Sequence, residues 1–240
     1  MEIVLIALLT IFAGLVGTVG GFGTSTIMVP VLALFFPLPA TLLLVGTIHW
    51  FSNIWKMLLF GEGFDWKFIA SFGIPAAFTS YLGASLVLEF PQSALLRVVG
   101  GVLVGYVVFL FLEPQFRLRK TAAAASMAGL CAGFLPGLVG IGGEVRSVFL
   151  AAFDLKKSLY IFTSGVLGFI VDSTRLATYF ATGIRVESLL LWGLLMFIPA
   201  SFVGAYLARR VVDRIPQRQF RMVVAVFLLA VGVKLLFSPQ

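Results

Sequence analysis

The sequence predicts an all-α polytopic membrane protein made of two homologous halves, and its composition, its apolar runs and a repeated glycine motif lead to that prediction. Of 240 residues, 60% are hydrophobic and 11% are charged, and the mean hydropathy is +1.10. A soluble domain has about 25% charged residues, so this chain has too few charges to cover a globule of its size. The composition excludes a soluble enzyme, a disordered chain and a disulfide scaffold, and indicates a protein buried in lipid.

The charges and the metal-binding residue types narrow the class further. The net charge is +7, and in a membrane protein such an excess is typical of basic cytoplasmic loops rather than of a nucleic-acid interface. Cys131 is the single cysteine and His49 the single histidine, so we expect neither an intrachain disulfide nor a zinc site. We expect no cofactor and no nucleic-acid partner.

Six apolar segments have the length of one membrane span. A helix that crosses about 30 Å of hydrocarbon needs about 20 apolar residues. Segments of that length are predicted at 40–60, 67–88, 92–112, 157–181, 187–208 and 219–237.

Two further apolar runs, 3–36 and 121–153, are too long for one span. Each has a glycine motif in its middle, GTVGGFG at 17–23 and GLVGIGG at 137–143. Glycine clusters break helices, and Pro136 adds a second break signal. Small-residue packing would explain one or two glycines spaced four apart, but not four within seven residues. Each run is therefore predicted to be a broken, re-entrant helix pair.

The two glycine motifs belong to an internal duplication. Gly20 and Gly23 match Gly140 and Gly143 at equal spacing, and the order of other matched motifs is preserved along the chain. Twofold repeats are the usual build of secondary transporters. The predicted division is a first transmembrane repeat (1–112), a basic cytoplasmic linker (113–120) and a second transmembrane repeat (121–240).

The basic residues decide between parallel and inverted halves. If both glycine-broken runs crossed fully, eight basic residues would lie inside and seven outside, which is no bias. If both runs are re-entrant, the second half is inverted, and twelve lie inside against three outside, as short loops require. We therefore expect an inverted repeat with both termini outside. The inside set is Lys56, Lys67, Arg117, Arg119, Lys120, Lys156, Lys157, Arg209, Arg210, Arg214, Arg218 and Arg221, and the outside set is Arg97, Arg185 and Lys234.

In an inverted repeat the two hairpins enter from opposite faces, and their glycine tips meet near the midplane. Irregular backbone at that depth is tolerated only inside protein or along a watery cavity. Each tip leads into a short helix whose N-terminus carries free N–H groups and a partial positive charge, which attract anions. The predicted substrate-binding residues at the tips are Gly20, Gly21, Phe22, Gly23, Thr24, Ser25, Gly140, Gly142 and Gly143.

These motifs carry a family resemblance over nearly the whole chain. GTVGGFGTS at 17–25, followed by Pro30 and repeated as PGLVGIGG at 136–143, resembles the TauE/SafE sulfite exporter family, also called the toluene sulfonate uptake permeases. The resemblance implies transport of sulfur-containing anions such as sulfite, sulfonates and sulfoacetate. The second motif departs from the family pattern, because Glu144 and Arg146 follow its glycines where small residues are usual.

Two charged residues follow the second tip. A buried arginine is costly in lipid and usually functional, and the planar guanidinium of Arg146 suits carboxylate or sulfonate oxygens. We therefore expect Arg146 to contact the substrate; the alternative is a structural partner of Glu144 or Asp172. Glu144 is interpreted as a gating proton site or, alternatively, as simple compensation of the helix dipole.

Polar residues on two further segments are also candidates. His49 and Asn53 lie four apart and share a helix face, and Asn53 corresponds to Ser173 in the repeat. All three are predicted substrate-binding residues, although His49 could instead be a hydrogen-bonded packing residue.

Asp172 and Arg175 lie three apart and can pair. A rise of about 1.5 Å per residue from residue 157 places Arg175 about 27 Å deep, nearer the outer surface. We expect Arg175 to act on the substrate as an outer gate or vestibule cation, with Asp172 in gating. The alternative is a snorkelling arginine with its acid partner.

The sequence thus predicts a secondary transporter of the bacterial inner membrane, an exporter of a small anion by alternating access. Neither a GxxxxGK[ST] motif nor a clustered nucleophile–base set occurs, so an enzyme is not expected. An anion channel and a non-transport membrane assembly protein remain the alternatives. The expected partners are a small anionic substrate and anionic lipids at the cytoplasmic face. A homodimer is a further option.

Overall fold

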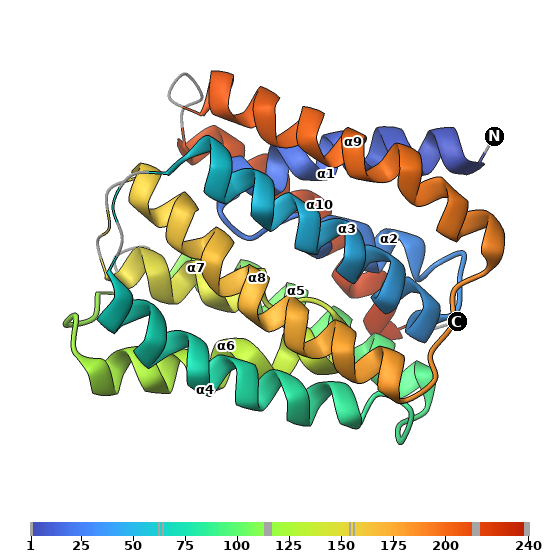
Figure 1. Ribbon diagram of the computed structural model, residues 1–240, viewed down its shortest axis with the longest axis horizontal. Helices are drawn as coiled ribbons and strands as arrows, with labels where there is room; N and C mark the ends of the chain where they lie inside the picture. Colours follow the sequence, from blue (N-terminus) through green and yellow to red (C-terminus); the bar gives the residue numbers. More distant parts are fainter. Residues whose placement is uncertain are drawn as a thin grey trace.

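The computed structural model describes residues 2–61, 63, 65–112, 117–153, 155, 157–212 and 217–237. Over these residues the chain forms ten α-helices and no strand (Figure 1). The helices are α1 (Glu2–Gly20), α2 (Ser25–Leu32), α3 (Leu38–Leu59), α4 (Trp66–Ser85), α5 (Gln92–Leu112), α6 (Ala122–Val139), α7 (Gly143–Ala152), α8 (Lys157–Ala181), α9 (Ser188–Val211) and α10 (Gln217–Phe237).

The helix lengths confirm a polytopic membrane protein. Among the described residues, α1, α3, α4, α5, α6 and α9 are long and apolar enough to cross a membrane. Both long apolar runs are broken at their glycine motifs, into α1 and α2 and into α6 and α7. Part of the predicted linker, 113–116, and part of the basic segment 209–221 lie outside the described residues, and so do Lys156 and Arg214.

Each broken run folds back on itself. Figure 1 shows α1 starting at the end of the molecule where the N-terminus lies and α2 returning toward that end. By length alone α1 could cross a membrane, since its 19 residues extend about 28 Å. Lack of apolar length does not explain why the chain turns back after α1. The glycine motif that breaks the helix does.

Helices of one half pack mainly on helices of the other. The principal contacts join α1 to α9, α4 to α6, α3 to α8 and α5 to α10. Exchanging α1–α5 with α6–α10 leaves this set of pairs unchanged, as a twofold relation requires. In Figure 1 a helix and its counterpart in the other half, such as α3 and α8, run in opposite directions. This arrangement supports the inverted repeat, whose orientation in a membrane stays a prediction, as does the division of the chain into two repeats and a linker.

Glycines let α6 approach α4 backbone to backbone. Gly129, Gly133 and Gly137 recur every four residues, and a Cβ on any of them would lie 2.0 to 2.2 Å from a carbonyl oxygen of α4. On the equivalent pair, a Cβ on Gly14 of α1 would meet the Cα of Gly204 in α9 at 3.3 Å. This is the small-residue packing typical of membrane helices. Gly137 therefore belongs to a packing surface, and only the later glycines of its motif form the break.

Candidate functional site

Both helix breaks depend on glycines with left-handed backbone, and the two breaks touch. Gly23 has φ of 90° and Gly140 has φ of 72°, a region that glycine adopts without the strain of a Cβ. A Cβ on Gly143 would lie 1.5 Å from the carbonyl oxygen of Phe22. The expected meeting of the two glycine tips is thereby confirmed, and no side chain fits between them.

Each break leads directly into a helix N-terminus. Helix α2 begins at Ser25 and α7 at Gly143, and neither has a hydrogen bond from a capping side chain. The hydroxyl of Thr24 is buried and has no hydrogen-bond partner within the described ranges, whereas the hydroxyl of Ser147 donates to the backbone oxygen of Glu144 at 2.7 Å. The first-turn N–H groups of a helix have no partner within the helix. The junction thus offers donors from two helices.

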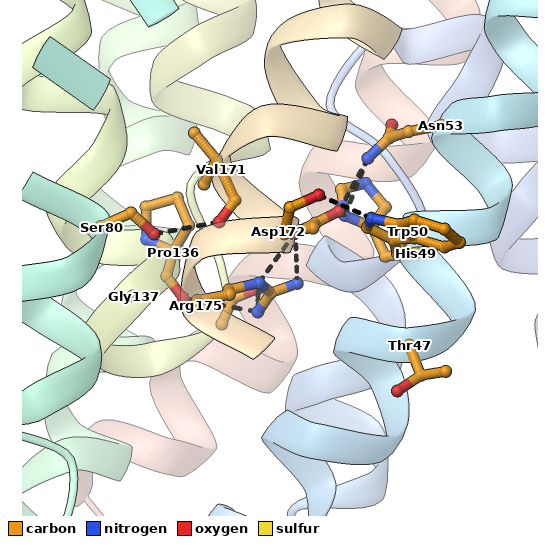
Figure 2. Close-up of polar contacts among 12 residues, drawn as sticks. Thr47, His49, Trp50, Asn53, Ser80, Pro136, Gly137, Val171, Asp172 and Arg175 are labelled. Carbon is orange, nitrogen blue, oxygen red and sulfur yellow. Dashed lines mark hydrogen bonds and ion pairs between the residues drawn. The ribbon is translucent and has the colours of Figure 1, made fainter. Parts of the chain in front are cut away.

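Asp172 of α8 lies at the centre of a buried polar network (Figure 2). Its Oδ1 accepts from Nε and Nη2 of Arg175, each at 2.8 Å. Its Oδ2 accepts from Nδ1 of His49 and from Nδ2 of Asn53, both at 2.8 Å. Four donors from α3 and α8 therefore satisfy this carboxylate, which is what a buried charge requires. The prediction that Asp172 pairs with Arg175 is confirmed, and so is the shared face of His49 and Asn53.

Arg175 lies at the second break and not near the surface. It is fully buried, and its Nη1 lies 3.4 Å from the carbonyl oxygen of Pro136 and 3.5 Å from that of Gly140. These carbonyls end α6, where a cation is favoured by the helix dipole. This burial excludes the alternative of a snorkelling arginine, because the end of α6 covers the guanidinium. The expected role of Arg175 as an outer gate or vestibule cation stays a prediction.

Lys56 extends the network on α3. Its ammonium group is buried and donates to Oδ1 of Asn53 at 3.1 Å. Counting Lys56 among the basic residues of the cytoplasmic loops was therefore wrong. Removing it from the set of twelve leaves eleven inside against three outside, so the charge bias that supports the predicted topology persists.

Arg146 has a different environment, although it is buried to a similar extent. Its Nε donates to the hydroxyl of Ser164 at 3.3 Å, and that hydroxyl donates to the carbonyl oxygen of Gly21 at 3.1 Å. Its Nη2 has no hydrogen-bond partner in the described part of the chain. Within the described residues, the ion pairs closer than 4 Å do not include Arg146. Its predicted alternative, a structural ion pair with Glu144 or Asp172, is therefore absent from this part of the chain.

Glu144 is a second buried acid, and the described residues satisfy it less well than Asp172. Its carboxylate is fully buried at the first turn of α7, and neither oxygen has a hydrogen-bond partner among the described residues. The helix dipole favours a negative charge there, but an isolated carboxylate in an apolar environment is costly and tends to neutralise. Glu144 is thus the buried acid that the surrounding protein satisfies least.

Some predicted site residues face elsewhere. The hydroxyl of Ser173 accepts from the indole of Trp50 at 2.8 Å and donates to the carbonyl of Phe169 at 2.7 Å, so it links α3 and α8 outside the Asp172 network. The ring of Phe22 covers Gly20, whose Cβ would lie 2.3 Å from it. These two glycine-motif residues shape the break by packing.

Two residues near the breaks were not predicted. Ser164 bridges Arg146 to the first break. Tyr160 lies against Gly21, since a Cβ there would be 2.2 Å from its hydroxyl. A single polar residue in an apolar helix belongs to no recognisable motif. Predicting these two positions requires knowing that α8 packs against both breaks, which the sequence alone does not show.

The comparison with protein families decides the class. The family model described as sulfite exporter TauE/SafE matches residues 6–235. The chain belongs to the sulfite exporter TauE/SafE family. A search of curated proteins found no match. Membership in TauE/SafE, a family of membrane transporters, implies a multi-pass membrane protein that transports sulfite or a related anion.

Proposed function

We propose that this TauE/SafE chain is a secondary exporter of a small sulfur-containing or organic anion, such as sulfite, a sulfonate or sulfoacetate. The substrate binds beside the contact between the two breaks, at the N-termini of α2 and α7. Alternating access exposes that site to each side of the bacterial inner membrane in turn. Export of an anion runs with the membrane potential, worth about 2.3 kcal/mol per charge per 100 mV.

The single observation that carries this proposal is that Arg146, a buried cation, has no carboxylate within 4 Å among the described residues. A buried cation without a carboxylate partner is costly, and the Nη2 of Arg146 has no hydrogen-bond partner among these residues either. An oxyanion at the junction would supply the missing charge and the missing acceptor. The guanidinium presents parallel donors that match two oxygens of a sulfonate or carboxylate.

The remaining polar groups have supporting roles in the proposal. The free hydroxyl of Thr24 and the first-turn N–H groups donate to the anion. Asp172 and Arg175 hold the helices around it, and Glu144 changes the local charge as the site opens. Anionic lipid at the cytoplasmic face is proposed to contact the basic residues Arg209 and Arg210, which lie exposed in the last turn of α9.

A flux assay tests the proposal. Purified protein in liposomes should carry radiolabelled sulfite, with a rate that saturates as a carrier requires. Arg146→Ala should lower the rate at least about tenfold, which corresponds to about 1.4 kcal/mol. Arg185→Ala, at an exposed position on the α8–α9 loop, is the matched control and should not. No flux of sulfite, sulfonate or sulfoacetate by the unmodified protein would reject the proposal, and non-saturating current would indicate a channel.

A further inference from the structure

His49 has one committed ring nitrogen and one free one. Its Nδ1 lies 2.8 Å from Oδ2 of Asp172, and because an ionised carboxylate only accepts hydrogen bonds, Nδ1 carries a hydrogen. Its Nε2 is buried and has no hydrogen-bond partner among the residues that the structure describes. This atom faces the first break, since a Cβ on Gly23 would lie 2.2 Å from it. Figure 2 shows His49 beside Asp172, which fixes the ring in this orientation.

The free nitrogen determines what can bind beside it. In a neutral imidazole with hydrogen on Nδ1, Nε2 carries a lone pair and can only accept. An oxyanion at the break also presents lone pairs, so the two acceptors repel each other unless a proton lies between them. Protonation at Nε2 converts this nitrogen into a charged donor, and such hydrogen bonds are stronger than neutral ones.

The charges around His49 link this proton to the anion. Burial opposes a positive imidazole most strongly, Asp172 from α8 favours it, and Lys56 on the same helix and Arg146 from α7 also oppose it. Arg175 already neutralises part of the Asp172 charge, and α2 carries no titratable residue. The basic residues of α9 lie exposed in its last turn. A bound anion adds negative charge to a group of three cations, so it favours a proton at Nε2 more than the empty site does.

We infer that the site binds its anion together with one proton. This proton is held on Nε2 of His49, whose N–H donates a hydrogen bond to a substrate oxygen. This inference rests on the proposed function and names its coupling partner. The proton comes from water on the side to which the site is open. The hydrogen on Nδ1 stays bonded to Nδ1 and continues to be donated to Asp172. His49 is therefore a binding residue that sets affinity by pH, and Asp172 is the residue that positions it.

Linked binding of one proton has a defined signature. When a ligand binds with one proton, its dissociation constant rises about tenfold per pH unit above the titration of the group. Methanesulfonate is the probe, because its oxygens take up no proton in the range in which a histidine titrates. The measurement is calorimetry on the full chain in detergent, in two buffers of different ionisation enthalpy, which gives the number of protons taken up.

The variants assign the proton to one residue. His49→Asn keeps an amide donor toward Asp172 but removes Nε2, so its affinity should be lower and independent of pH. His49→Gln is the second variant if the first fails to fold. Glu144→Gln removes the buried acid in the first turn of α7 and should keep the pH dependence. Arg185→Ala, far from the network, should behave as the unmodified protein.

The outcomes separate this inference from the proposed function. Methanesulfonate affinity that does not change with pH, or a pH dependence that survives in both His49 variants, overturns the inference and leaves anion transport intact. Loss of the pH dependence in Glu144→Gln assigns the proton to that acid and overturns it as well. If only sulfite binds, the same variants are compared with sulfite, whose own titration cancels between them. Binding of no anion at any pH rejects the proposed function, and the inference with it.

Discussion

The two buried arginines of this protein are equally hidden from solvent and differently satisfied. Arg175 is fully buried and Arg146 is 1% exposed. Arg175 donates twice to Asp172 and lies against the carbonyls that end α6. Among the described residues, Arg146 donates from Nε to the hydroxyl of Ser164, and its Nη2 has no partner. Burial therefore does not distinguish these two arginines, whereas their hydrogen-bond partners among the described residues do.

The two buried acids repeat the same contrast. Asp172 receives four hydrogen bonds and Glu144 receives none among the described residues. The satisfied pair, Asp172 with Arg175, lies on α8, and the unsatisfied residues, Glu144 with Arg146, lie on α7 at the break. Unsatisfied groups are where a protein can still gain free energy from a ligand, so α7 is the side on which the substrate should act.

The largest expected effect is on stability. Arg175→Ala should lower the free energy of unfolding by about 3–5 kcal/mol, because it leaves the Asp172 carboxylate buried with two donors fewer. Reversible denaturation of the purified protein measures this. Arg146→Ala is the matched control and should lower stability by less, since Arg146 has no ion pair within 4 Å among the described residues. Equal losses from both variants would erase the distinction between the two arginines.

The next effect is on anion affinity, for which Arg146 should matter more than Arg175. Arg146→Ala should weaken anion binding by about 2–5 kcal/mol, the range for loss of a buried charged partner. Arg146→Lys keeps the charge but loses the planar fork, and should cost about 1–3 kcal/mol, the scale of one charge-assisted hydrogen bond. Calorimetry with sulfite and sulfonates on folded variants gives both values. Full affinity in Arg146→Ala would move the site away from α7.

A smaller effect tests the contact between the breaks. Gly143→Ala places a Cβ where the carbonyl of Phe22 lies, so the breaks must separate, at about 1–3 kcal/mol for overpacking, and transport should fall. Gly105→Ala is the control, because a Cβ there meets nothing within 4 Å. Thermal unfolding and liposome flux are measured on both. Similar behaviour of the two variants would show that the contact between the breaks is dispensable.

The smallest effect lies at the surface. Asp65 caps α4 by accepting from the N–H of Phe68 at 3.0 Å, and its ion pair with Lys120, 2.8 Å long, lowers the pKa of Asp65. A lowered pKa stabilises the folded state above the unfolded pKa of the acid, and this stabilisation is lost as pH falls through the folded value. Both side chains are partly exposed, so at most about 1 kcal/mol is at stake.

Asp65→Asn isolates that charge, because asparagine keeps the cap. The difference in unfolding temperature between the unmodified protein and Asp65→Asn should shrink as pH falls from about 7 to about 3. A difference that stays constant over this range would mean that the ion pair contributes nothing.

The sequence predicted the breaks and their neighbours, because these depend on local chemistry. Glycine clusters break helices wherever they lie, and the spacing of His49 and Asn53, or of Asp172 and Arg175, fixes a shared helix face. Burial of Lys56 and Arg175 could not be predicted in this way. It depends on α8 packing against α3 and on the end of α6 covering the same place, and both contacts join residues more than 30 positions apart. Ser164 was missed for the same reason.

The close approach of α4 and α6 has a mechanical consequence. Each carbonyl of α4 that faces Gly129, Gly133 or Gly137 occupies the space of a missing side chain, so the two helices cannot slide without lifting apart. One belongs to the first repeat and the other to the second, and the same holds for α1 and α9. Each of these close contacts joins a helix of the first half of the chain to a helix of the second half. We therefore expect α4 with α6, and α1 with α9, to move as units when the protein changes conformation.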